Sequence, residues 1–355
     1  MKKFHQPGVK PYLITKSLNP ENQETPIQFI NNNIVDGNLF YRRNHFSYPH
    51  FTSSFYFLPI HGFVHTPRTF SLQEIYSLPS RTIKVVLECS GDKRDFFEPK
   101  AFGEQWEKGA ISQGIWKGVS LRTLLQYTGV IDAAKELVFE GYDYGERPDS
   151  DQMVNFSRSL PIEKALEPDT IIAYEYNNQP IPFKHGFPLR LIVPGWYAMA
   201  SVKWIKSITV IDKEFKGPYQ TVDYVYYPNK EDDSGKFPVT TINVNSTIQY
   251  PLNRQLLTTG LYHIKGIAWT GKGSIDKVEI SLDDGHTWET CQLTSTSEKY
   301  SWVSWNYQWE VLKKGEYTIK SKATDSHANV QPSKPFWNRK GYGYNAVDHI
   351  KVKVE

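Results

Sequence analysis

Short apolar runs recur at even spacing through the last third of the chain, and this spacing restricts the possible fold of that region strongly. The runs cover residues 261–269, 277–282, 302–309, 317–323 and 346–354. In the last run Ile350, Val352 and Val354 alternate with Lys351 and Lys353, the period of two that is typical of a strand with one buried face. Several short strands separated by turns indicate a sandwich. We therefore predict an all-β, immunoglobulin-like domain over residues 247–355.

The length of the chain also indicates two domains, because 355 residues exceed what one hydrophobic core usually supports. Aromatic residues make up 14 % of the chain, which favours strands. Within residues 1–246 the patterns predict strands at 83–87, 138–144 and 170–176, and short helices at 72–75, 121–127 and 161–166. The predicted fold class is thus α+β, with mixed sheets and short helices ahead of the β-sandwich.

Local signals refine this picture. Ser71 and Glu74 form a capping-box pattern for the first helix, and Ser120 is placed to cap the second. Residues 1–39 are polar and rich in Pro and Asn, so an arm over the surface is expected there. Residues 213–246 include a charged run at 230–236, which favours a polar linker.

Charge and cysteine content exclude several classes of protein. Lys and Arg exceed Asp and Glu by 41 − 38 = 3 without a basic tract, so nucleic-acid binding has little support. Two distant cysteines, Cys89 and Cys291, imply no disulfide framework. No run approaches the ~18 apolar residues of a membrane span. We expect a cytoplasmic protein, or an exported one if a signal peptide was removed.

Cys89 stands at the end of the apolar run 83–87, where Ser90 and Gly91 allow a sharp turn. Asp92, Lys93 and Arg94 follow at once, so a thiolate there would lie in positive potential, which should lower the thiol pKa and suit a soft metal. Cys89 is therefore a candidate metal ligand. The alternative is a small buried hydrophobic residue, the usual role of a lone cysteine.

Two further patches concentrate cationic side chains. The first is Tyr41, Arg42, Arg43, Asn44 and His45, a group able to hold phosphate or another oxyanion through charge-assisted hydrogen bonds. Its alternative is a solvated basic turn.

In the second patch His185, Arg190 and Lys203 flank an apolar strand. Cations on a buried framework are costly unless an anion meets them, which favours an anionic ligand over structural salt bridges, the alternative.

Two other motifs do not indicate function. His61 and His65 share a face of an expected strand but would stand ~13 Å apart, too far for one metal. Residues 281–288 match an Asp-box hairpin, which stabilises its own turn, so we interpret it as structural.

Taken together, the patches resemble the sulfite oxidase family of molybdopterin enzymes over nearly the whole chain. Cys89-Ser90-Gly91-Asp92-Lys93-Arg94 is similar to the family's C-A-G-N-R-R. His185-Gly186-Phe187-Pro188-Leu189-Arg190 and Ser201-Val202-Lys203-Trp204 are similar to its H-G-F-P-x-R and S-V-K-W segments, and Phe139 to Asp143 resembles another cofactor-contacting segment. The resemblance implies a molybdenum-molybdopterin cofactor, with Cys89 as metal ligand and with Asp143, Ser201 and Val202 joining the two cationic patches as cofactor contacts. It also implies a homodimer formed by the C-terminal domain.

The resemblance further implies a pocket for a small oxyanion. Arg43 and Arg94 stand where the family binds sulfite, Trp106 where it has a pocket tryptophan, and Lys340 where it has a third arginine. Phe156 stands where the family has a tyrosine. The cofactor is therefore indicated more strongly than the substrate.

Electrons should leave to a separate acceptor. We expect no haem, because there is no CxxCH and no His-Pro-Gly-Gly before residue 40. A cytochrome, a quinone-linked protein or oxygen would serve. Sulfite oxidation is the leading hypothesis. Reduction of nitrate or a sulfoxide by the same cofactor is the alternative, and a non-enzymatic binding protein with an immunoglobulin-like domain is a third.

Overall fold

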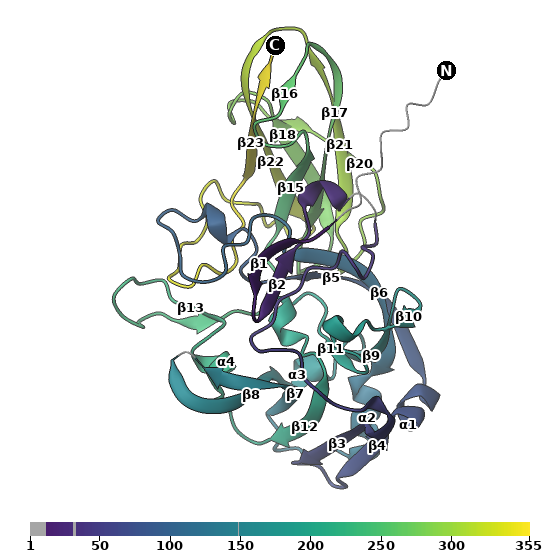
Figure 1. Ribbon diagram of the computed structural model, residues 1–355. Coiled ribbons are helices and arrows are strands. Elements are labelled where there is room, and N and C mark those ends of the chain that lie inside the picture. The colour runs from purple at the N-terminus through teal and green to yellow at the C-terminus, as the bar shows by residue number, and fades with distance from the viewer. Residues whose placement is uncertain (1–11, 31–32, 148) are drawn as a thin grey trace.

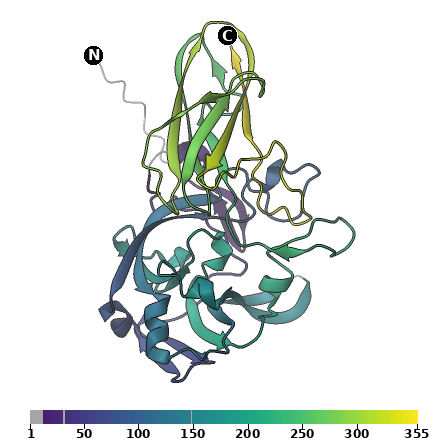
Figure 2. The ribbon, with the colours of Figure 1, turned by 180° about the vertical axis from the view of Figure 1, so that it is seen from behind.

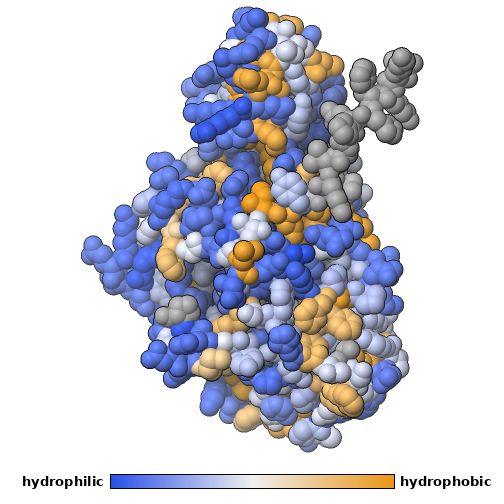
Figure 3. All heavy atoms as spheres, in the orientation of Figure 1, coloured by the Kyte–Doolittle hydropathy of each residue, from blue (hydrophilic) through white to orange (hydrophobic). Residues whose placement is uncertain are grey.

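The computed structural model describes residues 12–30, 33–147 and 149–355. A broad N-terminal part carries a narrower C-terminal part made of strands, and the view from behind shows the same arrangement (Figures 1 and 2). Hydrophilic residues cover most of the face in Figure 3, with hydrophobic residues in scattered groups.

The first sheet of the N-terminal part ends next to Cys89, which directly follows its strand β5 (Ser80–Glu88). Its strands run in the order β10-β9-β6-β5, with β11 also pairing with β9. They are β5 (Ser80–Glu88), β6 (Ile111–Ser120), β9 (Ile171–Tyr176), β10 (Gln179–Pro180) and β11 (Arg190–Ile192). The apolar run predicted at 83–87 lies in β5 and is fully buried from Val85 onward, so the strand ends deep in the molecule.

The second sheet lies across the same core, in the order β4-β3-β12-β7-β8. Its strands are β3 (Phe57–Gly62), β4 (Arg68–Ser71), β7 (Glu136–Arg147), β8 (Ser150–Pro161) and β12 (Ile205–Ile211). Only the β3–β12 pair is parallel. Leu58, Phe139 and Ile208 of this sheet pack in one cluster with Val86 and Ile111 of the first sheet.

Four short α-helices occur in the described residues: α1 (Leu72–Ser77), α2 (Leu121–Thr128), α3 (Ile162–Ala165) and α4 (Pro218–Thr221). None has the length and apolar character needed to cross a bilayer. The capping box of Ser71 and Glu74 is confirmed. The predicted cap of α2 is wrong: the Ser120 hydroxyl makes no capping hydrogen bond, and the residue is instead the last of β6, where it pairs with Ile171 of β9.

The C-terminal part contains two sheets around a second core, and the predicted strands are confirmed. One sheet has the order β15-β17-β21-β20, with strands β15 (Asn245–Tyr250), β17 (Gly260–Trp269), β20 (Gln292–Leu293) and β21 (Val303–Val311). The other has the order β16-β23-β22-β18-β19, with strands β16 (Leu256–Leu257), β18 (Ile275–Ser281), β19 (Glu289–Thr290), β22 (Gly315–Asp325) and β23 (Asp348–Val354). Ile280, Trp305 and Ile350 lie in the core between them.

The Asp-box hairpin is structural, as expected. The Asp283 carboxylate accepts hydrogen bonds from the Thr287 backbone at 2.9 Å and from the Thr287 hydroxyl at 2.7 Å, and these bonds close the turn. They also hold the pKa of Asp283 well below its usual range.

The predicted surface arm, residues 1–39, and the predicted linker, residues 213–246, both contribute buried residues to the core. Part of the arm, residues 1–11 and 31–32, lies outside the described residues. The rest contains the hairpin of β1 (Ile14–Leu18) and β2 (Glu21–Glu24), and Ile30 and Val35 are buried in the main core. The prediction was wrong here because Val35 donates to the Gln113 carbonyl of β6 at 2.8 Å, which ties the segment to the sheet.

The stretch predicted as a linker forms α4, β13 (Val225–Tyr226) and β14 (Phe237–Pro238). The aromatic side chains of Tyr219 and Tyr224 are buried there, which a solvated linker would not allow. The boundary between residues 246 and 247 stays a prediction, and β15 spans it.

Candidate cofactor and substrate site

Cys89 follows the last residue of β5 and faces two hollows. Its backbone N–H donates to the Ala110 carbonyl at 2.9 Å, and the Asp92 N–H donates to the Cys89 carbonyl at 2.8 Å, which makes the sharp turn expected at Ser90 and Gly91. Burial raises the pKa of the Cys89 thiol, although Arg43 and Arg94 oppose that effect. The expected lowering is therefore wrong for the free thiol, because desolvation outweighs the two guanidiniums. A bound metal cation would stabilise the thiolate.

An inner cavity of ≈ 60 Å³ opens beside Cys89. Every residue predicted to contact the cofactor lines it: Tyr41, Arg42, Arg43, Asn44, His45, Asp143, His185, Arg190, Ser201, Val202 and Lys203. These residues come from three separate stretches of sequence, so the fold has gathered them into one site. Whether each contacts a cofactor stays a prediction.

Two cations of the inner cavity, Arg190 and Lys203, form no salt bridge with a carboxylate among the described residues. The Arg190 guanidinium donates to the carbonyls of His185 at 3.1 Å and Ser201 at 3.3 Å, and burial lowers its pKa to about 10. The Lys203 ammonium donates to Asn44 Oδ1 and to the Arg43 carbonyl, and burial lowers its pKa while Asp143 raises it. Neither forms a salt bridge in this part of the chain, so an anion in the cavity would relieve a real electrostatic cost.

Arg42 differs from these two. Its guanidinium donates to Glu21 at 3.2 Å and Gln23 at 2.5 Å, so it is already paired at the edge of the cavity.

Two buried polar atoms on the cavity wall, Ser90 Oγ and Asp143 Oδ1, have no hydrogen-bond partner within the described part of the chain. Buried polar groups are normally hydrogen-bonded. A soft thiol, unpaired cations and free polar atoms around one cavity fit a group that carries a metal, a phosphate and hydrogen-bonding ring atoms.

Two histidines of the site are neutral. Burial and nearby cations lower the pKa of His185 and His45 well below 6.5. His185 Nε2 lies 3.0 Å from the Gly37 carbonyl, and His45 Nε2 lies 2.5 Å from the Tyr224 hydroxyl. Both rings therefore act as hydrogen-bonding groups rather than as cations.

A larger hollow of ≈ 1020 Å³, open to solvent, shares the lining residues Arg43, His45, Cys89 and Tyr224 with the inner cavity. Arg94 and Lys340 line it, as expected for an oxyanion pocket. Arg94 donates to three backbone carbonyls, those of Glu104 at 2.9 Å, Lys340 at 3.0 Å and Gly341 at 3.2 Å.

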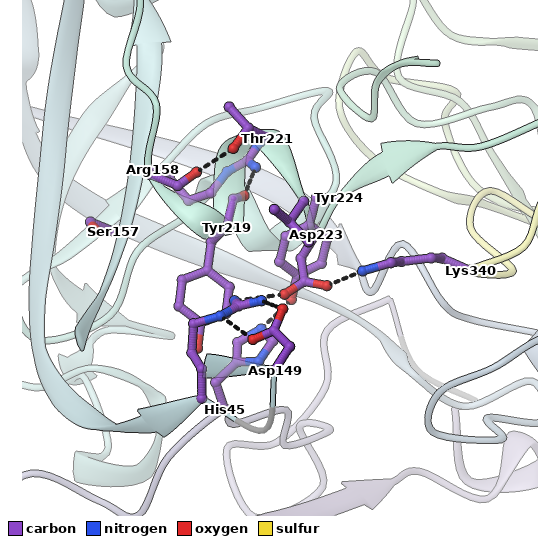
Figure 4. Close-up of polar contacts among 12 residues, drawn as sticks. His45, Asp149, Ser157, Arg158, Tyr219, Thr221, Asp223, Tyr224 and Lys340 are labelled. Atoms are coloured by element: carbon purple, nitrogen blue, oxygen red, sulfur yellow. Dashed lines mark hydrogen bonds and ion pairs between the residues drawn. The ribbon is translucent and has the colours of Figure 1, made fainter. Parts of the chain in front are cut away.

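Lys340 is paired with a carboxylate. Its ammonium lies 2.5 Å from Asp223, which also pairs with Arg147 at 2.9 Å, and Arg147 continues the network to Asp149 (Figure 4). Its charge is therefore largely balanced. Arg43, by contrast, has no carboxylate partner among the described residues; it donates to the Asn44 carbonyl and to His45 Nδ1.

Two predicted pocket residues behave differently. Trp106 is fully buried and lines neither hollow, so the prediction that it is a pocket residue is wrong. It packs instead in a core cluster with Cys89 and Phe40. Phe156 lines the inner cavity and stacks on His45, with ring centroids 5.1 Å apart and planes at 14°.

The sequence reasoning missed Tyr219, Asp223, Tyr224 and Tyr342, all of which line the outer hollow. The first three lie in the stretch interpreted as a linker. The dense run of tyrosines at 219–227 was the available signal, because solvated linkers rarely carry so many aromatic residues.

Comparison with known proteins agrees with this geometry. Residues 45–219 match the family model of the oxidoreductase molybdopterin binding domain, and residues 236–355 match that of the Mo-co oxidoreductase dimerisation domain. The crystal structure of the sulfane dehydrogenase SoxCD from Paracoccus pantotrophus superposes with a TM-score of 0.85, at 24 % identity, over 99 % of this chain and 94 % of that one. That likeness shows the fold.

Curated relatives include sulfite oxidases and nitrate reductases. Mitochondrial sulfite oxidase of Macaca fascicularis is 31 % identical over 97 % of this chain, and that of Drosophila melanogaster is 33 % identical over 95 %. Nitrate reductase [NADH] 1 of Phaseolus vulgaris is 30 % identical over 94 %. The chain spans 66 %, 62 % and 42 % of the lengths of these three relatives.

Proposed function

The chain belongs to the sulfite oxidase family of molybdopterin oxidoreductases, and from this premise we propose that it oxidises sulfite to sulfate and passes the electrons to a separate acceptor. The observation that carries the proposal is the set of unpaired cations beside a buried thiol. Arg190 and Lys203 line the inner cavity and form no salt bridge with a described carboxylate, so each can bind an anion there. Arg43 can do the same where the inner cavity and the outer hollow share residues.

The inner cavity is the proposed place of the molybdenum cofactor. Cys89 would hold the metal, because a thiolate is the preferred ligand of a soft ion. Arg190 and Lys203 would hold the anionic end of the pterin, while Ser90 and Asp143 have free polar atoms for its ring. When bound, the cofactor supplies oxygen-atom transfer and accepts two electrons.

The residues of the outer hollow would bind and orient the substrate. Arg43 offers a guanidinium that no described carboxylate neutralises, so a small oxyanion can pair with it. Arg94 donates hydrogen bonds to three backbone carbonyls and so stabilises the wall of the outer hollow. The Lys340–Asp223 pair lets Lys340 contribute a donor without adding a full unbalanced charge.

Reduction of nitrate is the second candidate, and the 30 % identity to a plant nitrate reductase favours it over other reductions. Nitrate is also a small oxyanion, so the same arginine would bind it. The two candidates differ in the direction of electron flow.

We further propose that residues 247–355 form an immunoglobulin-like domain that joins two copies of the chain. The match to a dimerisation domain and the two facing sheets support this. The absence of a haem, the cytoplasmic location and the identity of the electron acceptor stay predictions.

The test is steady-state sulfite oxidation with a soluble one-electron acceptor, alongside nitrate and sulfoxide reduction with a reduced dye. The sample is the purified protein with its molybdenum content measured. We expect sulfite-dependent reduction of the acceptor in proportion to molybdenum. No sulfite turnover in a fully loaded sample that reduces nitrate would overturn the proposal in favour of the second candidate.

A further inference from the structure

Exposed leucines gather at the far end of the C-terminal part of the chain. Among the described residues five leucines are exposed, and four of them lie at this end: Leu252 (37 %), Leu256 (64 %), Leu261 (58 %) and Leu312 (75 %). The fifth, Leu18, lies in β1 of the N-terminal part. Single exposed apolar residues are ordinary, but a group of them at one place indicates a contact surface.

Three segments meet at this end and together form what we call the tip: residues 252–261, 310–316 and 351–355. The strand pairs that join them are Leu256 with Lys353, Gly260 with Val311, and Gly315 with Val354. The tip is the extremity of the narrow C-terminal part, at the top of Figure 1, and no residue of it lines either hollow. Figure 3 shows hydrophobic residues among hydrophilic ones there.

The sandwich does not need these leucines for its own core. Side chains alternate along a strand, and Leu257 and Val311 already fill the inner positions. Their neighbours Leu256 and Leu312 therefore face solvent. The tip thus carries apolar surface that has no partner within the described part of the chain.

Five exposed cationic side chains accompany the leucines, against three exposed carboxylates. The cations are Arg254, Lys313, Lys314, Lys351 and Lys353, and the carboxylates are Glu310, Glu316 and Glu355. The net charge of the tip is 5 − 3 = +2, most of the 41 − 38 = +3 of the whole chain. Of the five cations, Lys353 alone forms a salt bridge within the described residues, with Glu355 at 2.6 Å. The tip is therefore complementary to an anionic surface.

We propose that the tip binds the surface of a bilayer that contains anionic lipids. Leu256, Leu261 and Leu312 insert at the level of the headgroups, and the unpaired cations bind lipid phosphates. Exposed apolar side chains combined with Lys and Arg are typical of segments that lie in a membrane interface. Each cation near an anionic surface adds to the attraction. Contact of this kind needs no membrane-spanning segment.

A second copy of the chain fits the tip less well. In a two-fold contact a patch meets itself, so the unpaired cations of the two tips would face one another, and like charges repel. A stable dimer also buries about 800 Å² on each partner, which a narrow extremity does not readily offer. The proposed dimer therefore uses another face of the sandwich.

The first measurement is cosedimentation of the purified full chain with vesicles. One vesicle contains phosphatidylcholine alone, and the other contains phosphatidylcholine and phosphatidylglycerol in equal parts. We expect binding to the anionic vesicles to be at least about tenfold stronger than to the neutral ones, and to weaken at high salt.

The leucines are tested by the double variant Leu256→Ser, Leu312→Ser. It should bind the anionic vesicles at least about tenfold more weakly, because two apolar side chains no longer enter the interface. Leu18→Ser is the matched control, since Leu18 is 80 % exposed but lies away from the tip. It should bind as wild type does. All three positions are exposed, so thermal unfolding should change little in either variant.

The cations are tested by the double variant Lys313→Gln, Lys314→Gln, which should bind the anionic vesicles about tenfold more weakly. The control is Lys213→Gln, Lys216→Gln, which makes the same change in net charge on exposed residues of the N-terminal part. Its binding should stay within twofold of wild type.

Insertion is measured separately with an environment-sensitive dye on Leu312→Cys. Both native cysteines are buried, so the dye reacts with the added thiol. We expect its emission to shift to the blue on anionic vesicles, and the same dye on Leu18→Cys to show no shift.

A wild-type chain that does not bind the anionic vesicles would overturn the proposal, and so would binding by Leu256→Ser, Leu312→Ser within twofold of wild type. An unshifted dye at position 312 would overturn the insertion of the leucines. If vesicles are not bound and the leucine double variant halves the mass in sedimentation, a second copy covers the tip instead. None of these measurements requires sulfite turnover, so the proposed function is decided independently.

Discussion

Among single residues, Cys89 is the one on which metal binding should depend most. Cys89→Ser changes one buried atom, so the fold should survive and the cationic cavity should still hold the pterin. A hydroxyl is a poor ligand for a soft metal, so turnover should be lost. The measurements are molybdenum and pterin content, thermal unfolding and sulfite oxidation. Activity per molybdenum equal to that of wild type would contradict the role of Cys89.

Arg190 should serve the cofactor rather than the fold alone. We expect Arg190→Gln to lower pterin content several-fold, because it removes an unpaired cation from the cavity wall. Arg158→Gln is a close control: burial lowers the pKa of both arginines to about 10, but Arg158 lines neither hollow. Both variants should lose stability, and pterin content should separate them. Equal pterin loss in the two would indicate a purely structural role.

Arg43 should bind the substrate anion. Arg43→Gln keeps a donor but removes the charge, so kcat/KM for sulfite should fall by about a hundredfold, or ~2.7 kcal/mol, as for loss of a charge-assisted bond. Lys16→Gln is the control: Lys16 also lines the outer hollow but is paired with Glu24 at 2.6 Å, so its loss should change kcat/KM by less than threefold. Steady-state kinetics at two salt concentrations would check both values, and a normal kcat/KM in Arg43→Gln would refute the assignment.

At the scale of elements, the loop after β5 is held by the C-terminal part of the chain. The buried Lys93 ammonium donates to Asn245 Oδ1 and to the Ser246 carbonyl, both at 2.8 Å. Gly343 N–H donates to the Ser90 carbonyl at 2.7 Å, next to Cys89. The sandwich and its returning segment thus shape the turn that presents the thiol.

Lys93→Met should therefore damage the cofactor site as well as stability. The substitution leaves two buried acceptors and nearby carboxylates without their cation, which should lower the free energy of unfolding by about 3 kcal/mol. Lys108→Met breaks another contact between the two parts, the 2.7 Å pair with Asp348, and lies away from both hollows. We expect both variants to unfold at a lower denaturant concentration than wild type, but only Lys93→Met to lose molybdenum. Normal molybdenum content in Lys93→Met would show that the loop does not need this contact.

The elements also show what a sequence can reveal. Strands β5, β17 and β23 and the capping box of α1 were predictable, because periodicity and local hydrogen bonding decide them. The groups at 41–45 and 185–203 were found because each is contiguous. Asp223 and Tyr224 were not, because their role depends on packing against Arg147, His45 and Tyr342. The direction of the Cys89 pKa depends on burial, which no local motif reveals.

For the whole molecule, stability should depend on pH through Lys203. Burial lowers the pKa of the folded-state ammonium to about 7, below its ordinary 10.5. Between these values the unfolded chain binds more protons, so the stability of the cofactor-free protein should rise as pH increases from about 7 to 10. Lys203→Met should flatten that slope, and bound cofactor should reduce it. Urea unfolding across this range checks the effect; an equal slope in Lys203→Met would refute it.

The proposed dimer gives a second prediction at this scale. Sedimentation of the purified protein should give twice the 41.0 kDa of one chain. A mass that stays at one chain across a hundredfold range of concentration would contradict it.

The contacts of residues 340–343 with Arg94, Asp223 and Ser90 also bear on the order in which the chain folds during synthesis. A ribosome releases these residues 340 − 89 = 251 positions or more after Cys89, so the wall they form cannot close near the thiol until the C-terminal sheets have been synthesised. Until then the outer hollow lacks one wall. Cofactor insertion then has a natural time window, after the N-terminal sheets have formed and before residues 340–343 fold back over them.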